Sequence, residues 1–284
     1  MSFDPKAFTR ESAATWTDAA ERYDKLSSRL FGPTAEAFVE FAGLRKGWRA
    51  LELACGPGLA SRAAAKLLGE KGSLLATDLA PGMIERARTT PPVKRGAPIE
   101  WKVMDAQALD LPDASFDACF SQLGLMLFAE PAKALAEMAR VTEPGGPVSC
   151  LVQGRADRME LTALIMMTMV QKAPELKAPP GAPTLFSFGQ EGVIETAFAK
   201  AGLTEILTRR LSGTFRFASA EEYWEVMTEG AGKTGQMLRS LSHEKQFFIK
   251  KEVIRKANRF REGGGLAIPY EFVMARGAAP ARKK

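Results

Sequence analysis

The chain has 284 residues, of which 46% are hydrophobic and 25% charged, and its formal net charge is +6. These are the proportions of a globular protein with a sizeable core. The longest apolar stretch, Leu161 to Val170, is too short to cross a bilayer, and no signal peptide is visible at the start. Three cysteines without CxxC spacing argue against a disulfide framework or a zinc site. We therefore expect a cytoplasmic protein without a metal.

Residues 1–45 have a helical pattern and are expected to form a lid over the rest of the chain. Trp16, Ala20 and Tyr23 are spaced at i, i+4 and i+7, which puts them on one face of a first helix. A second helix is expected at about residues 34–42. We predict N-terminal lid helices over 1–45 and a main domain over 46–284.

Between Arg49 and Gln153, short apolar runs alternate with helical segments. This alternation is typical of βαβ units, which form a parallel sheet with helices on both faces. The candidate strands are Arg49–Ala54, Ser73–Asp78, Ile99–Met104, Phe116–Ser121 and Val148–Gln153, and the candidate helices are Leu59–Leu68, Gly82–Thr89 and Pro131–Val141.

Beyond Gln153 the regular alternation ends. Helical insertions are expected at about 155–188 and 218–262, and a capping box at Ser219 and Glu222 should begin a helix in the second. Two further strands are predicted, at Leu203–Leu211 and Ile268–Ala275.

The first strand leads directly into a glycine turn, which a helix follows. Gly56 and Gly58 allow a sharp change of direction and allow a ligand to touch the backbone. A GxG turn also occurs where an α/β protein needs it only for packing. Other residues must therefore decide what this turn does.

Three acidic residues are expected at the carboxyl edge of the sheet, where open α/β folds bind ligands. Asp78 ends the second strand, where a carboxylate can accept both hydroxyls of a ribose, while Glu52 lies in the first strand and Asp105 closes the third. Such a set would repel a pyrophosphate and attract sulfonium and ammonium groups. Ser61 stands where a dinucleotide fingerprint has its third glycine, which argues against a dinucleotide. The charges favour S-adenosylmethionine (SAM).

Five segments in chain order carry a family resemblance. They are Glu52 to Gly58, Asp78-Leu79-Ala80-Pro81-Gly82-Met83, Met104-Asp105-Ala106, Leu111-Pro112-Asp113-Ala114-Ser115-Phe116-Asp117 and Glu143-Pro144-Gly145-Gly146. They resemble the motifs of class I SAM-dependent methyltransferases, in the small-molecule branch (methyltransferase type 11) that includes the ubiquinone and menaquinone C-methyltransferases. The resemblance covers about residues 15–153 and is only architectural beyond them. With the predicted strands it implies a Rossmann-like three-layer α/β sandwich, whose seven-stranded sheet is mostly parallel with an antiparallel last strand.

The resemblance also implies roles for individual residues. The cofactor would be SAM, with S-adenosylhomocysteine as its product. Ala54, Gly56 and Gly58 would form the turn beside the methionine part, and Glu52 would lie near its amino group, although the family more often has Asp there. Asp78 would bind the ribose, Leu79 and Met83 would border the adenine, Asp105 and Ala106 would contact its amino edge, and Ser121 would face the methionine part or the acceptor.

The sulfonium methyl group is already activated, so we expect in-line displacement in which the enzyme mainly aligns the acceptor and excludes water. A base is optional, and weak candidates are His243 and Tyr23. Aromatic and thioether side chains outside the sheet predict a pocket for a small hydrophobic or aromatic acceptor, although such stripes also pack helices. The candidates for this pocket are Trp16, Tyr23, Met167, Tyr223, Trp224 and Met227.

Other functions stay open from the sequence. They are an RNA-directed methyltransferase, a non-catalytic SAM-binding protein and a nicotinamide-dependent oxidoreductase, which would leave Glu52 and Asp105 unexplained. The basic run from Lys245 to Arg261 fits a solvated helix face or an anionic partner surface. No appended RNA-binding module and no Asn-Pro-Pro-Tyr-like motif supports nucleic acid as a partner. The sequence does not name the acceptor, the atom methylated or the oligomeric state.

Overall fold

The computed structural model describes residues 3–230 and 232–281, and one twisted sheet runs through it. Hydrogen-bonded neighbours follow the order β3-β2-β1-β4-β5-β8-β6. The first five strands in this order are parallel, and β8 is antiparallel to both of its neighbours. The strands are β1 Arg49–Leu53, β2 Ser73–Asp78, β3 Ile99–Val103, β4 Ala118–Gln122, β5 Pro147–Gln153, β6 Thr204–Phe217, β7 Arg261–Glu262 and β8 Gly265–Ala278.

This arrangement confirms the predicted Rossmann-like α/β fold with an antiparallel last strand. The sheet has eight strands and not seven, because the two-residue strand β7 pairs with the start of β8. The turn between them consists of Gly263 and Gly264, whose φ angles of +58° and +85° lie in the left-handed region.

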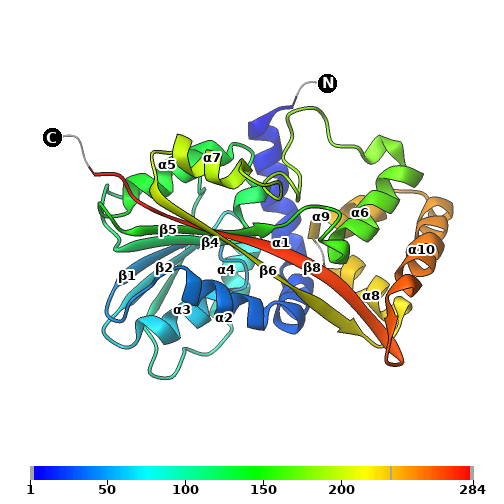
Figure 1. The fold of residues 1–284 in the computed structure, drawn as a ribbon, viewed down its shortest axis with the longest axis horizontal. Coiled ribbons are helices and arrows are strands. Elements are labelled where there is room, and N and C mark those ends of the chain that lie inside the picture. Colours follow the sequence, from blue (N-terminus) through cyan, green and yellow to red (C-terminus); the bar gives the residue numbers. More distant parts are fainter. Residues whose placement is uncertain (1–2, 231, 282–284) are drawn as a thin grey trace.

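Helices cover both faces of the sheet and so form the outer two layers. Figure 1 shows α5 and α7 on one face, and α2 and α3 on the other. Strand β1 lies in the middle of these layers, and four of its five residues are buried. The layered helices are α2 Gly32–Phe41, α3 Leu59–Leu68, α4 Pro81–Arg88, α5 Pro131–Val141 and α7 Val193–Lys200.

Strands β6 and β8 are longer than predicted, with 14 residues each. Residues 212–217 continue to alternate and pair with Leu266 to Glu271 of β8, so the two strands form a ribbon that extends beyond the rest of the sheet. The ribbon carries a helical lobe at its far end (Figure 1). The lobe contains α6 Glu160–Lys172, α8 Ala220–Gly230, α9 Gly232–Arg239 and α10 His243–Ala257, with short helices η2 Pro174–Leu176 and η3 Asn258–Phe260.

The capping box predicted in this lobe forms at the start of α8. The Ser219 hydroxyl accepts a hydrogen bond from the Glu222 N–H at 3.0 Å, and the Glu222 carboxylate accepts one from the Ala218 N–H. The lobe helices fall within the ranges 155–188 and 218–262, and the division of the chain into a lid and a main domain stays a prediction.

Helix α1, Pro5–Leu30, lies across the carboxyl ends of the strands and contacts α4, α8 and α9. Asp4 caps its start by accepting hydrogen bonds from the Lys6 and Ala7 N–H groups. Within residues 3–230 and 232–281, no helix combines the length and the hydropathy needed to cross a bilayer.

Candidate functional site

The turn between β1 and α3 has an unusual backbone. Ala54, Gly56 and Gly58 have φ angles of 53°, 55° and 85°, all in the left-handed region. A side chain at Gly58 could not be accommodated, because its Cβ would lie 2.4 Å from the Trp101 ring. Ala54 adopts this conformation without being glycine, which costs energy and is common at binding sites. The turn presents Ala54 and Gly56 to a cavity at the end of the sheet.

Asp78, at the end of β2, holds this turn in place. One carboxylate oxygen accepts a hydrogen bond from the Gly56 N–H at 2.8 Å, and the other accepts one from the Ala80 N–H at 2.9 Å. Burial raises the pKa of Asp78 to about 6, while these N–H donors act to lower it. At neutral pH the carboxylate is therefore mainly ionised, and it lines the cavity.

Asp105 lies just after β3, on the opposite side of Asp78 from the glycine turn. Its carboxylate accepts hydrogen bonds from the backbone N–H and the side-chain amide of Gln107, at 2.9 and 3.0 Å. Gln107 is held in turn, because its carbonyl oxygen accepts the Glu130 N–H at 2.7 Å. Asp105 thus stabilises the turn that follows it, as aspartate commonly does, and also lines the cavity.

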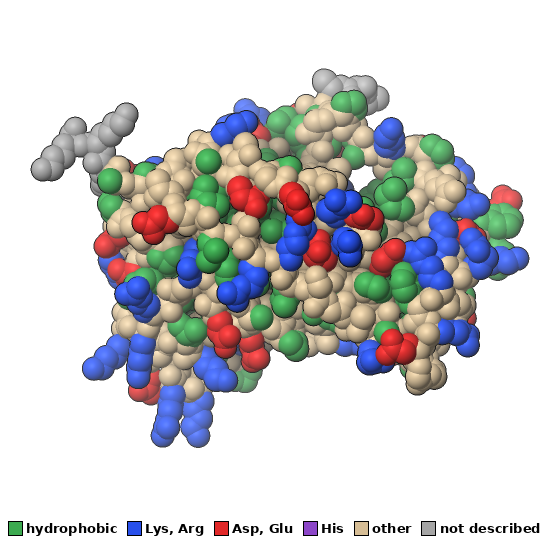
Figure 2. Space-filling view, viewed as in Figure 1, with side chains coloured by type: hydrophobic (Ala, Val, Ile, Leu, Met, Phe, Trp, Pro, Cys, Tyr) green, Lys and Arg blue, Asp and Glu red, His purple; other side chains and the backbone are tan. Residues whose placement is uncertain are grey.

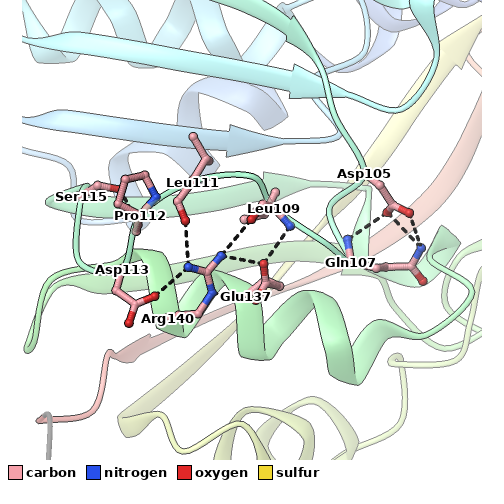
Figure 3. Close-up of polar contacts among 9 residues, drawn as sticks. All are labelled: Asp105, Gln107, Leu109, Leu111, Pro112, Asp113, Ser115, Glu137 and Arg140. Carbon is pink, nitrogen blue, oxygen red and sulfur yellow. Dashed lines mark hydrogen bonds and ion pairs between the residues drawn. The ribbon is translucent and has the colours of Figure 1, made fainter.

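The loop that follows Asp105 is fixed by Arg140 on α5. Figure 3 shows the Arg140 guanidinium donating to the carbonyl oxygens of Leu109 and Leu111, and pairing with Asp113 and Glu137. Glu137 also accepts the Leu109 N–H at 2.8 Å. These contacts join α5 to the loop through the backbone of Leu109 and Leu111 and through the Asp113 carboxylate. They therefore hold the loop against α5, next to Asp105.

Glu52 differs from the other two acids, and its contact with the ligand stays a prediction. It is buried, it is absent from the described residues that line the cavity, and its carboxyl accepts the Ser61 hydroxyl at 2.5 Å. Burial raises the pKa of Glu52 to about 8, because the Ser61 hydrogen bond and the Arg62 charge only partly offset the loss of water. At neutral pH the carboxyl is mostly protonated, so among the described lining residues the acids are Asp78 and Asp105.

Helix α1 forms the opposite wall of the cavity. Phe8, Ser12, Trp16 and Tyr23 recur at helical spacing and all line it. Trp16 and Tyr23 pack edge to face, with ring centroids 5.1 Å apart. The sequence predicted Trp16 and Tyr23 on this side of α1 but missed Phe8, Thr9 and Ser12. These three residues have no pattern that distinguishes them from residues of an ordinary helix.

Salt bridges and close packing hold α1 over the strand ends. Asp24 pairs with Arg86 of α4 at 2.7 Å, and a Cβ on Gly82 would lie 2.6 Å from the Thr17 carbonyl oxygen. On the other side, Gly232 of α9 packs so closely on the Trp16 ring that a Cβ there would be 2.5 Å away. The wall is therefore built from packing between α1, α4 and α9.

The loop after β4 completes the cavity. Gln122, Leu123, Gly124, Leu127 and Phe128 line it, and Leu123 has a positive φ of 58°. In the described part of the chain, neither the buried Ser121 hydroxyl nor the Gln122 carbonyl oxygen has a hydrogen-bond partner. Buried polar atoms without partners are uncommon, and Gln122 is one of the residues that line the cavity.

The cavity has an empty volume of about 720 Å³, part of it open to solvent. Seven of the ten residues expected to bind the cofactor line it, together with Trp16 and Tyr23 from the expected acceptor pocket. The seven are Ala54, Gly56, Asp78, Leu79, Met83, Asp105 and Ala106. Glu52, Gly58 and Ser121 lie behind this lining and support it.

The structure brings only Trp16 and Tyr23 of the predicted acceptor pocket to this cavity. Met167, Tyr223, Trp224 and Met227 are absent from the described residues that line the cavity. Tyr223 is fully buried and donates to the Leu161 carbonyl oxygen at 2.8 Å, and Trp224 and Met227 are buried core residues. Met167 is 59% exposed on α6. These residues pack the lobe or face solvent, because the same helical spacing serves both a core and a pocket.

Neither candidate base fits its expected role. His243 is exposed at the start of α10 and does not line the cavity. Tyr23 lines the cavity, but burial and the Asp78 charge raise its pKa to about 12, so it stays protonated at neutral pH. Among the described lining residues there is no histidine, lysine or arginine.

Comparisons with known proteins agree with this geometry. Residues 51–150 match the family described as "Methyltransferase domain". Aklanonic acid methyltransferase DauC of Streptomyces sp. (strain C5) is 27% identical over 61% of this chain and 81% of that protein. The malonyl-[acyl-carrier protein] O-methyltransferase of Yersinia pestis is 34% identical, but the match spans only 52% of each chain.

Solved structures of other methyltransferases share the fold. Phosphoethanolamine N-methyltransferase 2 of Haemonchus contortus, solved in complex with SAM, superimposes with a TM-score of 0.57 at 15% identity, over 93% of this chain and 57% of that one. At this identity the likeness concerns the fold alone. The motifs, the strand order and the family match together establish that the chain belongs to the class I SAM-dependent methyltransferases, with SAM as its cofactor.

Proposed function

We propose that this methyltransferase acts by in-line displacement on a small hydrophobic or aromatic acceptor, which binds in the cavity beneath α1. The observation that supports the proposal is that the cavity has acidic residues on one side and aromatic residues on the other. Asp78 and Asp105 line it from the strand ends, and Phe8, Trp16 and Phe128 line it from α1 and from the loop after β4. A cationic cofactor and an apolar acceptor could therefore bind next to each other.

The residues at the strand ends fit SAM. Asp78 would accept the ribose hydroxyls, and its charge would attract the positive groups of the ligand. Leu79, Met83 and Ala106 offer apolar surface for the adenine, with Asp105 at its amino edge. The unpartnered Gln122 carbonyl oxygen could accept from an ammonium group or from the acceptor. When bound, SAM supplies a methyl group that is already activated.

The residues of the opposite wall would position the acceptor and exclude water. Aromatic rings give a large apolar contact at little entropic cost, and the hydroxyls of Thr9 and Ser12 add a few polar contacts. The similar proteins are named for aklanonic acid and for a malonyl group on acyl-carrier protein, which supports a small organic acceptor. Alignment of two reactants can lower a barrier by roughly 7–11 kcal/mol.

The lining residues also limit which acceptor groups can react, because some acceptors must first lose a proton. Tyr23 stays protonated, and the described lining contains no histidine or lysine. If Asp78 and Asp105 bind the cofactor, the acceptor atom should be nucleophilic at neutral pH without a further protein base, as in a carboxylate or a neutral amine. A carbon acid or an ordinary phenol, which must first lose a proton, fits this lining poorly.

The proposal is tested by methyl transfer from labelled SAM to a panel of small acceptors. The panel should pair each aromatic carboxylate or amine with a hydrophilic analogue that carries the same reacting group. We expect turnover with the aromatic members and an unchanged rate in His243→Ala. Transfer to transfer RNA alone, or turnover that disappears in His243→Ala, would contradict the proposal.

A further inference from the structure

The outward face of α10 carries two neighbouring aromatic side chains that the fold leaves in solvent. Ile249, Val253 and Ala257 turn toward the core at i, i+4 and i+8. Phe247 and Phe248 point elsewhere and are 63% and 51% exposed, with ring centroids 5.7 Å apart. Single exposed apolar residues are ordinary, but two phenylalanines in sequence on one helix form a patch.

Helix α6 packs against another side of α10 and fixes that helix in the lobe. Gln171 of α6 accepts a hydrogen bond from Lys256 of α10 at 3.1 Å. Phe247 and Phe248 remain uncovered and together are named the apolar ridge.

Basic residues surround the apolar ridge. Helix α10 has five basic residues and two acidic ones, and Lys251 follows Phe247 by one turn. Within the described chain, Lys250 and Lys251 form no ion pair, whereas Lys245 and Arg255 are paired with Glu175 and Glu252. Figure 2 shows basic and hydrophobic side chains together at the end of the molecule where Figure 1 places α10.

We infer that α10 docks the protein on an anionic lipid surface. The phenylalanine rings would enter the boundary between headgroups and acyl chains, and Lys250 and Lys251 would bind lipid phosphates. An amphipathic helix with aromatic residues between lysines has the chemistry that binds such surfaces. The inference stands on the lobe alone and does not depend on the proposed acceptor.

The geometry of the rings favours a lipid surface over RNA. The planes of Phe247 and Phe248 meet at 72°, so the two rings do not form a continuous platform on which successive bases could stack. Helix α10 lies at the outer end of the lobe (Figure 1), which suits contact with an extended surface. The lobe adjoins the cavity wall, because Thr15 of α1 donates to Gln236 of α9 at 2.8 Å. A docked lobe would therefore hold the cavity close to the lipid.

The test is cosedimentation of the full chain with lipid vesicles. We expect binding to vesicles of equal parts phosphatidylglycerol and phosphatidylcholine, weaker binding to phosphatidylcholine alone, and release at high salt. The double variant Phe247→Ser/Phe248→Ser should bind at least about tenfold more weakly, because two large apolar side chains no longer leave water. Lys250→Glu/Lys251→Glu should lose the preference for anionic lipid.

Matched controls separate the apolar ridge from general surface effects. Leu207→Ser removes another exposed apolar side chain, and Lys94→Glu/Lys102→Glu reverses two exposed charges on a different surface. Both should bind vesicles like the parent. As a direct reporter, the tryptophan in Phe247→Trp should shift its emission to the blue when vesicles are added.

Several results would overturn the inference. It fails if the parent does not bind the anionic vesicles, or if the serine variant binds them as well as Leu207→Ser does. It also fails if labelled single-stranded RNA binds while vesicles do not. Self-association that the serine variant abolishes, without vesicle binding, would assign the apolar ridge to a second copy of the chain and not to lipid.

Discussion

The two walls of the cavity are built in different ways. On the strand side, Ala54, Asp78 and Asp105 each follow directly from the end of a strand, and backbone N–H groups or a neighbouring amide fix both acids. On the α1 side, Phe8 and Trp16 are positioned by packing between helices that are far apart in sequence. One wall is set by local hydrogen bonds and the other by tertiary contacts.

This difference suggests that the two walls bind different ligands. Polar groups held by short hydrogen bonds lose little freedom when a ligand binds, which suits recognition of a constant cofactor. A wall of aromatic side chains on a helix can change between proteins without disturbing the sheet, which suits an acceptor site. The comparison predicts that substitutions at the charged strand ends weaken ligand binding strongly, and that substitutions in the helical wall weaken it less.

Asp78→Ala should have the largest effect. We expect the affinity for S-adenosylhomocysteine to fall at least about 100-fold, because hydrogen bonds to a charged group contribute roughly 1.5–3 kcal/mol each. Calorimetric titration measures this loss. Asp110→Ala, which removes an exposed aspartate outside the cavity, is the matched control and should bind like the parent. Equal affinities in the two variants would remove Asp78 from the cofactor site.

Trp16→Ala tests the helical wall. Loss of this ring from the lining should weaken binding of the acceptor by about tenfold, because much apolar contact is lost. The matched variant is Trp224→Ala, which removes a buried ring from the lobe. It should lower the free energy of unfolding by roughly 3–5 kcal/mol in urea titrations while leaving the affinity of the folded protein unchanged. A reversed pattern would place Trp224, and not Trp16, at the acceptor.

The pH dependence of cofactor binding should follow Asp78. Its pKa of about 6 lies above the ordinary value of 3.8, and the ligand needs the ionised form. Affinity should therefore fall about tenfold between pH 7 and pH 5, as the carboxylate is protonated. The effect on folding has the opposite sign, because the contribution of Asp78 to stability is present at low pH and is lost as the pH rises through about 6.

The matched variant for this profile is Asp78→Asn, which cannot titrate. Its weaker binding of S-adenosylhomocysteine should show no fall between pH 7 and pH 5. If the variant kept the full pH dependence of the parent, another group would be responsible.

Glu52→Gln should have the smallest effect on binding. Because burial raises the pKa of Glu52 to about 8, the carboxyl is mostly protonated at pH 7, and a neutral amide of the same shape can replace it. The contribution of the Glu52 carboxyl to stability is lost as the pH rises through about 8, so the variant should gain stability relative to the parent in thermal unfolding at alkaline pH. An S-adenosylhomocysteine affinity reduced as strongly as in Asp78→Ala would show that Glu52 acts as a charged ligand.

The sequence by itself determined the strand side of this molecule. Alternating strands and helices specify a parallel sheet, and a parallel sheet brings all its carboxyl ends to one edge. Asp78 and Asp105 could therefore be placed together before any contact was known. The regular face of the first helix also predicted that Trp16 and Tyr23 would share a wall.

Only the tertiary structure decided the rest. The aromatic and methionine residues of 159–170 and 220–230 have the same spacing whether they fill a core or line a pocket, and packing placed them in the lobe. Burial beside Ser61 made Glu52 a mostly neutral support for the turn. Burial and the docking of helices depend on residues far apart in the chain, and local sequence patterns do not contain that information.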